Sequence, residues 1–369
     1  MELKMNKILK KKKKSLNIVD SQKQHRIRTV RGRDIFEMSV HSSSSSNQTL
    51  VRVPAIIDQR FKIVRHLDSG GQGSVFIAED LCLMNRKVVV KATKHDPEVL
   101  EEIVQNLDWL EYKSKYRDIL LEEAKNLITL QLRSESRLPC LIKVVRDIQA
   151  DLWVDPNTAQ SDSSELTDVY LVMQYLPGQT LKDLIKQVKS GKHPIYQLHQ
   201  KEWWRMCLVW MRQLASILEN LHKLIDDKGF MFCDLKPDNC MISNEDISII
   251  DFGALEPYSS QESYSEVVLS TPGYCAPETQ QEMYRADLND KVDIYSAGAM
   301  LWSMITGLKA SDYAIYDNSP NLLEVKDALP KNLPKSIREI LKMTLAEERD
   351  KRPSASELKK LCIQAAYRV

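Results

Sequence analysis

The stretch CDLKPDN, from Cys233 to Asn239, is followed by DFG at Asp251 to Gly253, which begins twelve residues beyond Asn239. The two stretches place a carboxylate, a lysine, an amide and a second carboxylate at fixed spacing: Asp234, Lys236, Asn239 and Asp251. A lone D-x-K-x-x-N is common in surface loops. The spacing to DFG and the motifs along the rest of the chain therefore decide what this polar set does.

The composition is typical of a soluble globular protein, with 43% hydrophobic and 28% charged residues in a chain of 369. No apolar run approaches the roughly 20 residues that span a bilayer. The N-terminal MELKMNKILKKKKK has no long apolar segment behind its basic residues, so we do not expect a secretory signal. The seven cysteines are scattered and lack C-x-x-C spacing, which favours a reducing, cytoplasmic location over a disulfide or metal framework.

The net charge of +1 is unevenly distributed. Residues 1–35 carry twelve Lys or Arg against three acids, so the start of the chain is basic and the remainder acidic. Residues 1–55 also contain the runs Lys10–Lys14 and Ser42–Ser46 with few apolar residues, and we expect this extension to be mostly disordered. It can contact a polyanion or an acidic partner, or remain a solvated extension. In either case, deletion of residues 1–50 is expected to leave catalysis largely unchanged.

The rest of the chain changes from strand patterns to helix patterns. Short β-type runs between residues 61 and 93 predict an antiparallel sheet. Apolar residues spaced by three and four predict helix, in more than one piece, in the charged segment that runs to about residue 130. After Pro177-Gly178 the pattern becomes mainly helical, and we expect the bulky Trp203 and Trp210 of the first long helix to lie in the core. The expected organisation is α+β, with an extension at 1–55, a lobe at 56–176 that contains a helical insert at about 95–120, and a lobe at 177–369.

Taken in order, the motifs resemble those of the eukaryotic-type, or Hanks-type, serine/threonine protein kinases over roughly residues 58–365. The resemblance implies a bilobal fold, with a small antiparallel sheet and one helix in the first lobe and a larger, mainly helical second lobe. It also implies ATP and Mg²⁺ as cofactors and protein substrates that present a Ser or Thr hydroxyl. Lys236 in DLKPDN and Thr271 in STPGYCAPE favour this class over the tyrosine kinases.

The resemblance assigns separate roles to the polar set, because phosphoryl transfer depends on positioning and charge neutralisation more than on covalent help. Asp234 orients the attacking hydroxyl and Lys236 meets the transferring phosphate. Asn239 and Asp251 hold magnesium on the phosphate oxygens.

A lysine and a glutamate outside the polar set complete the implied catalytic residues. Lys91, which ends VVVK, matches the strand lysine that holds the α- and β-phosphates. Its helix partner is Glu123 in EAKNLITL, with the neighbouring Glu122 as the competing choice.

The nucleotide site is implied by a glycine-rich loop and a hinge. The loop is DSGGQGSV, residues 68–75, in which glycines let backbone N–H groups approach phosphate. Asp68 stands where the family's first glycine is expected. MQYLPG, residues 173–178, resembles the hinge between the lobes. The implied nucleotide contacts are Gly70, Gly71, Gly73, Lys91, the gatekeeper Met173, the backbones of Gln174 and Leu176, and Val75, Val89 and Met241 around the purine.

Phe232-Cys233 stands where the family has His-Arg before the catalytic Asp. The family's arginine pairs with a phosphorylated residue of the activation segment, and that pair orders the segment. Cys233 therefore implies a non-RD kinase that is active without activation-segment phosphorylation. Phe232 is still expected to pack on Phe252. The remaining matches are structural braces: an ion pair between Glu278 and Arg352, and Asp293 beneath the catalytic loop.

A binding protein is the alternative to an active kinase. In that alternative the chain is a pseudokinase scaffold, or a binding module that works through its basic N-terminal tail. Asp68, Phe232 and Cys233 are the residues that support it. Every charged group expected in the transfer site is present, however, which favours the active kinase.

Overall fold

The computed structural model describes most of the chain and divides it into two compact units. The first unit comprises residues 1–118 and 145–172, and the second comprises residues 119–144 and 173–369. Each is considered by itself. The described residues are 25–30, 33–41, 48–69, 73–93, 109–132, 137–147, 168–225, 227–259, 270–280, 288–314 and 321–369.

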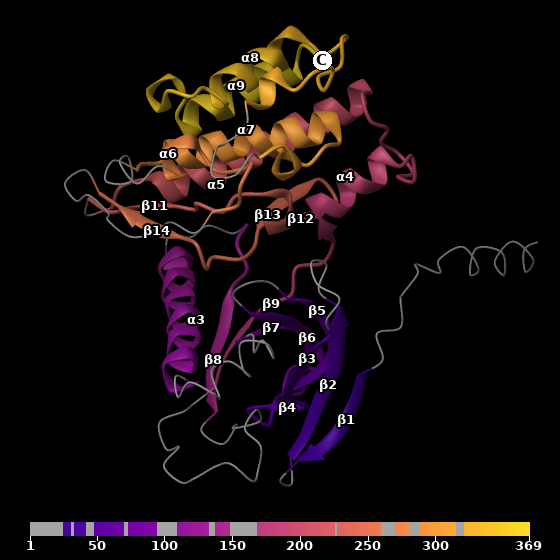
Figure 1. Cartoon of the computed structure of the whole chain (residues 1–369), viewed down its shortest axis with the longest axis vertical. Coiled ribbons are helices and arrows are strands. Elements are labelled where there is room, and N and C mark those ends of the chain that lie inside the picture. Colours follow the sequence, from indigo (N-terminus) through magenta and orange to yellow (C-terminus); the bar gives the residue numbers. More distant parts are fainter. Residues whose placement is uncertain are drawn as a thin grey trace, which may run out of the picture. The chain divides into compact units, whose positions relative to one another are not determined.

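A six-stranded sheet with the order β4-β5-β6-β7-β9-β8 forms the frame of the first unit (Figure 1). The pairs from β4 to β7 are antiparallel, as the strand pattern predicted. Its inner face buries alternate residues of neighbouring strands, such as Phe76 on β6 and Val90 on β7. The strands are β4 (Ile56–Ile57), β5 (Phe61–Ser69), β6 (Ser74–Asp80), β7 (Arg86–Ala92), β8 (Leu141–Asp147) and β9 (Asp168–Gln174).

A second antiparallel sheet lies within the segment expected to be disordered. It consists of β1 (His25–Val30), β2 (Arg33–His41) and β3 (Gln48–Pro54), in the order β1-β2-β3. Phe36 is 2% exposed and its ring meets Phe76 edge-on, with centroids 6.2 Å apart. Met38 and Val53 join the same buried cluster.

The expectation of a disordered extension at 1–55 is therefore wrong over β1, β2 and β3. The alternating apolar residues of β2 are few in number, but they pack on a sheet that already exists, so they do not need a core of their own. Residues 1–24 and 42–47, with the lysine and serine runs, lie outside the described part of the chain. The expected partner of the lysine run stays a prediction.

The predicted helical segment is described as α3 (Trp109–Leu132), while residues 94–108 lie outside the described part. Leu127 and Leu130 are buried in the core cluster of the second unit, and Asn126 Nδ2 donates to the Leu255 carbonyl at 3.4 Å. The unit boundary at 172/173 therefore differs from the expected 176/177, and the second unit also takes residues 119–144.

The second unit is mainly helical, as predicted. Trp203 and Trp210 are each at most 1% exposed, and Trp203 Nε1 donates to the Met304 carbonyl at 2.8 Å, so these aromatic residues are core. Two small sheets, β10-β12-β13 and β11-β14, flank the polar motifs, with β10 at Gln179–Thr180 and β13 at Asp246–Ile249. The helices are α4 (Leu181–Lys189), α5 (Lys201–His222), α6 (Pro277–Gln280), α7 (Lys291–Thr306), α8 (Lys335–Thr344) and α9 (Ala355–Ala366).

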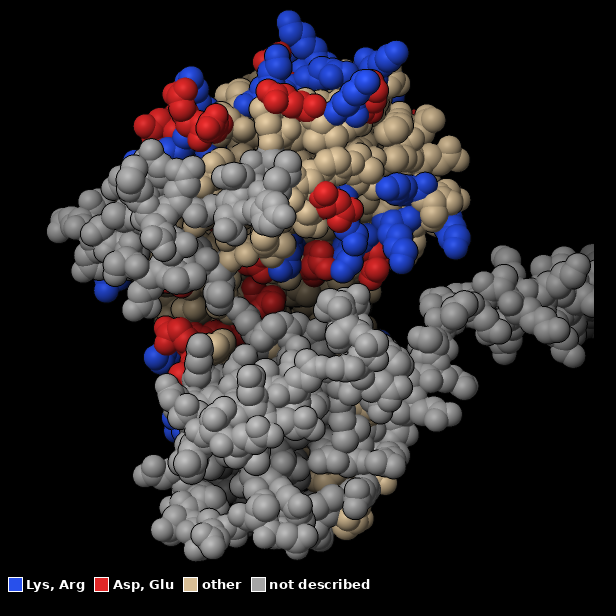
Figure 2. Space-filling model, in the orientation of Figure 1, with Lys and Arg blue, Asp and Glu red and all other residues tan. Residues whose placement is uncertain are grey.

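The surface of the second unit carries charges of both signs side by side (Figure 2). Lys359 pairs with Glu219 at 2.9 Å and Lys351 with Glu348 at 2.6 Å. Among the described helices, none is long and apolar enough to cross a membrane.

Candidate active site

The loop between β11 (Gly229–Met231) and β12 (Cys240–Ser243) brings Lys236 and Asn239 of the predicted polar set to Asp234, while Asp251 follows β13 (Asp246–Ile249) and lies outside these contacts. Lys236 Nζ donates to Asp234 Oδ2 at 2.7 Å, and the Thr271 hydroxyl donates to Oδ1 of the same carboxylate. Asn239 Nδ2 donates to Asp234 at both the carbonyl oxygen, at 2.8 Å, and Oδ2, at 3.0 Å. Lys236 also reaches the Thr271 hydroxyl at 2.8 Å. Three predicted site residues and the activation-segment threonine thus share one hydrogen-bond network.

A buried carboxylate fixes the backbone just before Asp234. Asp293, on α7, is fully buried and accepts hydrogen bonds from the backbone N–H groups of Phe232 at 2.8 Å and Cys233 at 2.9 Å. His222 Nε2 meets the same carboxylate at 2.8 Å. The predicted brace is confirmed. The histidine was missed, because a His at the end of an apolar helix gives no signal of its own.

The two residues at the His-Arg position are both buried. Phe232 packs edge-on against Phe252, with ring centroids 5.6 Å apart, as predicted. Cys233 is 3% exposed and has a φ of +64°, a conformation that costs strain for a residue other than glycine. Burial raises the pKa of the Cys233 thiol well above its usual value, and the nearby Asp293 carboxylate adds to the rise. This position therefore holds a neutral group rather than a cation.

The two predicted magnesium ligands are oxygen donors of the kind that Mg²⁺ prefers. Because Asn239 donates its amide hydrogens to Asp234, its Oδ1 atom is the one suited to a cation. The Asn239 carbonyl also accepts from Ile250 N at 2.8 Å, next to the exposed Asp251. Within the described residues no cluster of three or more His, Cys, Asp or Glu could hold a metal ion. Two oxygen donors suit an ion that takes its other ligands from phosphate and water.

The first unit brings together its own group of predicted residues. Val75 on β6 pairs with Lys91 on β7, so these residues and Val89 lie on the sheet face opposite Phe76. Lys91 is only 4% exposed, which is unusual for a lysine in a solvated strand.

Of the predicted loop glycines, Gly73 is the one within the described part, and Gly70 and Gly71 lie outside it. A Cβ at Gly73 would lie 2.4 Å from the Ala92 carbonyl oxygen. The residue must therefore be glycine for space alone.

The predicted hinge begins at the end of β9, and its residues 173–176 are half-buried. Gln174 N donates to the Cys140 carbonyl at 2.8 Å, so its carbonyl oxygen is the backbone group suited to adenine. Met173 and Leu176 are half-buried, as is Met241 on β12.

The two glutamates that competed for one role differ in environment. Glu123 is 1% exposed, whereas Glu122 is exposed and pairs with Lys125 at 2.6 Å along the helix. Burial favours Glu123 as the residue with a specific role, because an exposed i,i+3 pair is an ordinary helix feature.

An acidic residue of the loop proved to be paired. Asp238 forms an ion pair with Lys182 of α4. The two charges largely cancel, so Asp238 exerts little net attraction on a basic residue of a substrate.

The predicted ion pair at the end of the activation segment is confirmed. Arg352 donates to both oxygens of Glu278, at 2.6 and 2.9 Å, and its side chain is fully buried.

Removing one partner of the Glu278–Arg352 pair leaves a buried charge. Glu278→Ala is therefore expected to lower the free energy of unfolding, measured with denaturant, by about 3–5 kcal/mol. Glu348→Ala is the control. It breaks an exposed pair with Lys351 and should cost at most about 1 kcal/mol. Equal losses would mean that the buried pair does not act as a brace.

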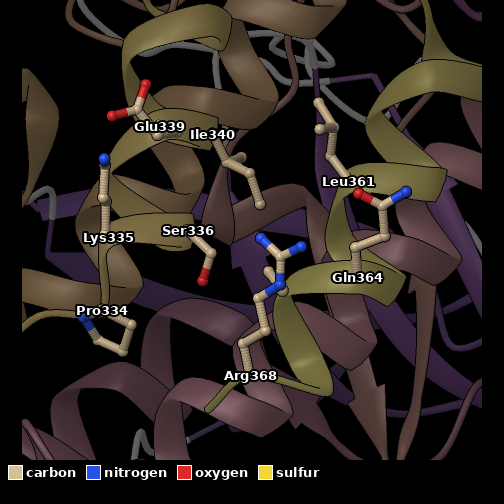
Figure 3. Close-up of a pocket in the computed structure, with 9 residues that line it drawn as sticks. Pro334, Lys335, Ser336, Glu339, Ile340, Leu361, Gln364 and Arg368 are labelled. Atoms are coloured by element: carbon tan, nitrogen blue, oxygen red, sulfur yellow. The ribbon is translucent and has the colours of Figure 1, made fainter.

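A hollow of about 540 Å³ opens between α8 and α9 (Figure 3). Ile340, Leu361, Lys335 and Arg368 are among the residues that line it, and the Arg368 side chain points into it. None of the predicted site residues lines this hollow, so it is separate from the candidate active site.

Comparison with known proteins agrees with the geometry of the loop. The model of the protein kinase domain matches residues 61–361. The chain belongs to the protein kinase family. This kinase domain is of the eukaryotic, or Hanks, type and has the bilobal α+β fold of the family.

Relatives of the kinase domain carry serine/threonine kinase names. The serine/threonine-protein kinase pkn2 of Myxococcus xanthus is 28% identical over 68% of this chain and 25% of its own length. The serine/threonine-protein kinase PknD of Chlamydia muridarum is 26% identical over 67% of this chain and 25% of its own. STE20 of Saccharomyces cerevisiae, also named a serine/threonine-protein kinase, is 31% identical over 52% of this chain and 19% of its own. The chain spans between a quarter and a third of the length of the first relatives.

Proposed function

We propose that this chain transfers the γ-phosphate of ATP to Ser or Thr hydroxyls of protein substrates, in a magnesium-dependent reaction. The observation that carries the proposal is the network around Asp234, in which Lys236, Asn239 and Thr271 all contact one carboxylate. A carboxylate held in this way can accept a hydrogen bond from an incoming hydroxyl and take its proton as the bond to phosphorus forms. Lys236 then lies beside the point where negative charge develops.

The proposed magnesium ligands are Asn239 and Asp251. When bound there, magnesium would neutralise charge on the phosphate oxygens. Lys91 is the proposed ligand of the α- and β-phosphates, and its burial supports a role other than solvation. Val75, Val89, Met241, Met173 and the backbones of Gln174 and Leu176 are the proposed adenine contacts, with Gly70, Gly71 and Gly73 over the phosphates.

The proposal is tested by incubating purified protein with labelled ATP and peptides that differ only in Ser, Thr or Tyr at the acceptor. Transfer to the Ser and Thr peptides that requires Mg²⁺ and stops with excess EDTA is expected. Transfer to none of the three would favour the pseudokinase alternative, and transfer to Tyr alone would contradict the substrate class.

The buried glutamate is proposed to position Lys91. Glu123→Ala is therefore expected to lower kcat/KM for ATP by about 10- to 100-fold, the range for one lost charge-assisted contact. Glu122→Ala, which removes an exposed carboxylate from the same helix turn, should change kcat/KM less than about twofold. A larger loss of kcat/KM in Glu122→Ala than in Glu123→Ala would assign the positioning of Lys91 to Glu122 instead.

We also propose that the enzyme does not need phosphate on its activation segment. The neutral, buried Cys233 supports this, because it cannot pair with a phosphate as an arginine does. Enzyme treated with phosphatase should keep most of its activity, and so should a variant with Ser259, Ser260, Ser263 and Ser265 changed together to Ala. A loss of about tenfold or more on dephosphorylation, reversed by autophosphorylation, would show a phosphate switch.

A further inference from the structure

A pair of short strands joins the activation segment to the backbone that precedes the catalytic loop. β14 (Glu256–Tyr258) begins three residues after Gly253, and β11 ends three residues before Asp234. The two strands are antiparallel, with Gly229 opposite Tyr258 and Met231 opposite Glu256, and they run side by side in Figure 1. The DFG motif precedes β14 and Asp234 follows β11. Contacts that hold the two strands together therefore also fix the position of the DFG motif relative to Asp234.

Tyr258 extends this pair beyond its backbone contacts. Its hydroxyl donates to the carbonyl oxygen of His222, the last residue of α5, at 2.6 Å. Its ring lies over Gly229, where an added Cβ would come within 2.5 Å of the ring atom Cε1. Gly229 has no positive φ, so glycine is required here for space rather than for conformation. The missing side chain at Gly229 is what lets the tyrosine reach the helix end.

The residue that Tyr258 binds also supports the catalytic loop. The His222 ring meets Asp293 at 2.8 Å, and Asp293 holds the N–H groups of Phe232 and Cys233. The activation segment is thus linked to the backbone before Asp234 through Tyr258, His222 and Asp293.

Cys233 lies in the same region. It follows β11 by two residues, and β11 pairs with β14. Burial raises the pKa of the Cys233 thiol, and the Glu256 carboxylate of β14 adds to the rise, so the residue at the arginine position lies near the strand that Tyr258 anchors.

We infer that Tyr258 is a positioning residue that holds the start of the activation segment against the catalytic loop, in place of an arginine–phosphate pair. This inference rests on the proposed kinase function. It predicts that the tyrosine hydroxyl contributes to kcat although it does not touch the substrate. It also predicts that Gly229 and Tyr258 act as one unit.

The test compares Tyr258→Phe with the parent in the full chain after phosphatase treatment. Removing the hydroxyl should lower kcat by about tenfold, the equivalent of one net hydrogen bond, while KM for ATP changes less than about twofold. Tyr367→Phe is the control, because Tyr367 is 89% exposed, and it should leave kcat unchanged. An unchanged kcat in Tyr258→Phe would overturn the inference.

Gly229→Ala gives an independent variant, since the added methyl displaces the ring and keeps the hydroxyl from His222. It should lower kcat as Tyr258→Phe does, and the double variant should be no worse than Gly229→Ala alone. If the kcat losses of the two single variants multiply in the double variant, Gly229 and Tyr258 do not form one anchor.

Hydrogen exchange separates failure of this inference from failure of the proposed function. Amides of residues 229–233 and 254–259 should exchange at least about tenfold faster in Tyr258→Phe than in the parent. If the parent transfers no phosphate yet exchange still rises, the anchor stands and the proposed function fails. If transfer is normal and exchange is unchanged, the proposed function stands and the anchor is overturned.

Discussion

Asp234→Asn is expected to lower kcat by about 100- to 10,000-fold, the range for loss of a general base. The amide keeps the size of the carboxylate but cannot accept the substrate proton. It also presents a donor where Lys236 and Thr271 now donate. Steady-state kinetics with a Ser or Thr peptide measures the loss, and KM for ATP should change little because Asp234 is not a proposed nucleotide ligand.

Asp238→Asn is the matched control for Asp234→Asn. It removes a carboxylate four residues further along the same loop, where the charge is partly exposed and paired with Lys182. Its kcat should stay within about threefold of the parent, since an exposed ion pair has a small energy. Similar losses in both variants would show that the effect is not specific to the predicted base.

Deletion of residues 1–54 is expected to abolish cooperative unfolding of the first unit. The deletion removes β1, β2 and β3 and uncovers apolar surface that Phe36, Met38 and Val53 now bury. Replacing one buried Phe by Ala costs about 3–5 kcal/mol, and total stability is typically about 5–15 kcal/mol, so the loss of several such residues is too large to tolerate. Calorimetry of the parent and of the protein that lacks residues 1–54 measures this loss of cooperative unfolding directly.

This prediction replaces the expectation that deletion of residues 1–50 leaves catalysis largely unchanged. Deletion of residues 1–20, which keeps all three strands, is the control and should leave the transition temperature unchanged. Phe36→Ala should cost about 3–5 kcal/mol, whereas Ile27→Ala, at a side chain 60% exposed on the same sheet, should cost under about 1 kcal/mol. A stable, active protein after deletion of residues 1–54 would show that the small sheet is dispensable.

Much of the second unit could be predicted because its function depends on linear motifs. DLKPDN, DFG and the APE region place their residues within short stretches, so the contacts of Asp234 with Lys236 and Asn239 follow from local spacing. The Glu278–Arg352 pair joins residues that lie 74 positions apart, and it was found only through the family resemblance.

The contacts that the sequence did not predict join residues with no shared pattern. Tyr258 reaches the His222 carbonyl only because Gly229 has no side chain, and neither residue belongs to a motif. The β1–β3 sheet was missed for a related reason. Its few apolar residues look insufficient by themselves, and their burial depends on a surface supplied by strands that come later in the chain.

Transfer of labelled phosphate by phosphatase-treated protein tests the central claim most directly. The protein is dephosphorylated, freed of the phosphatase, and given labelled ATP, Mg²⁺ and a Ser or Thr peptide, with Asp234→Asn as the reference. We predict transfer far above that of Asp234→Asn and close to that of untreated protein. Transfer no greater than that of Asp234→Asn, by protein whose hydrogen exchange matches that of untreated protein, would contradict the account.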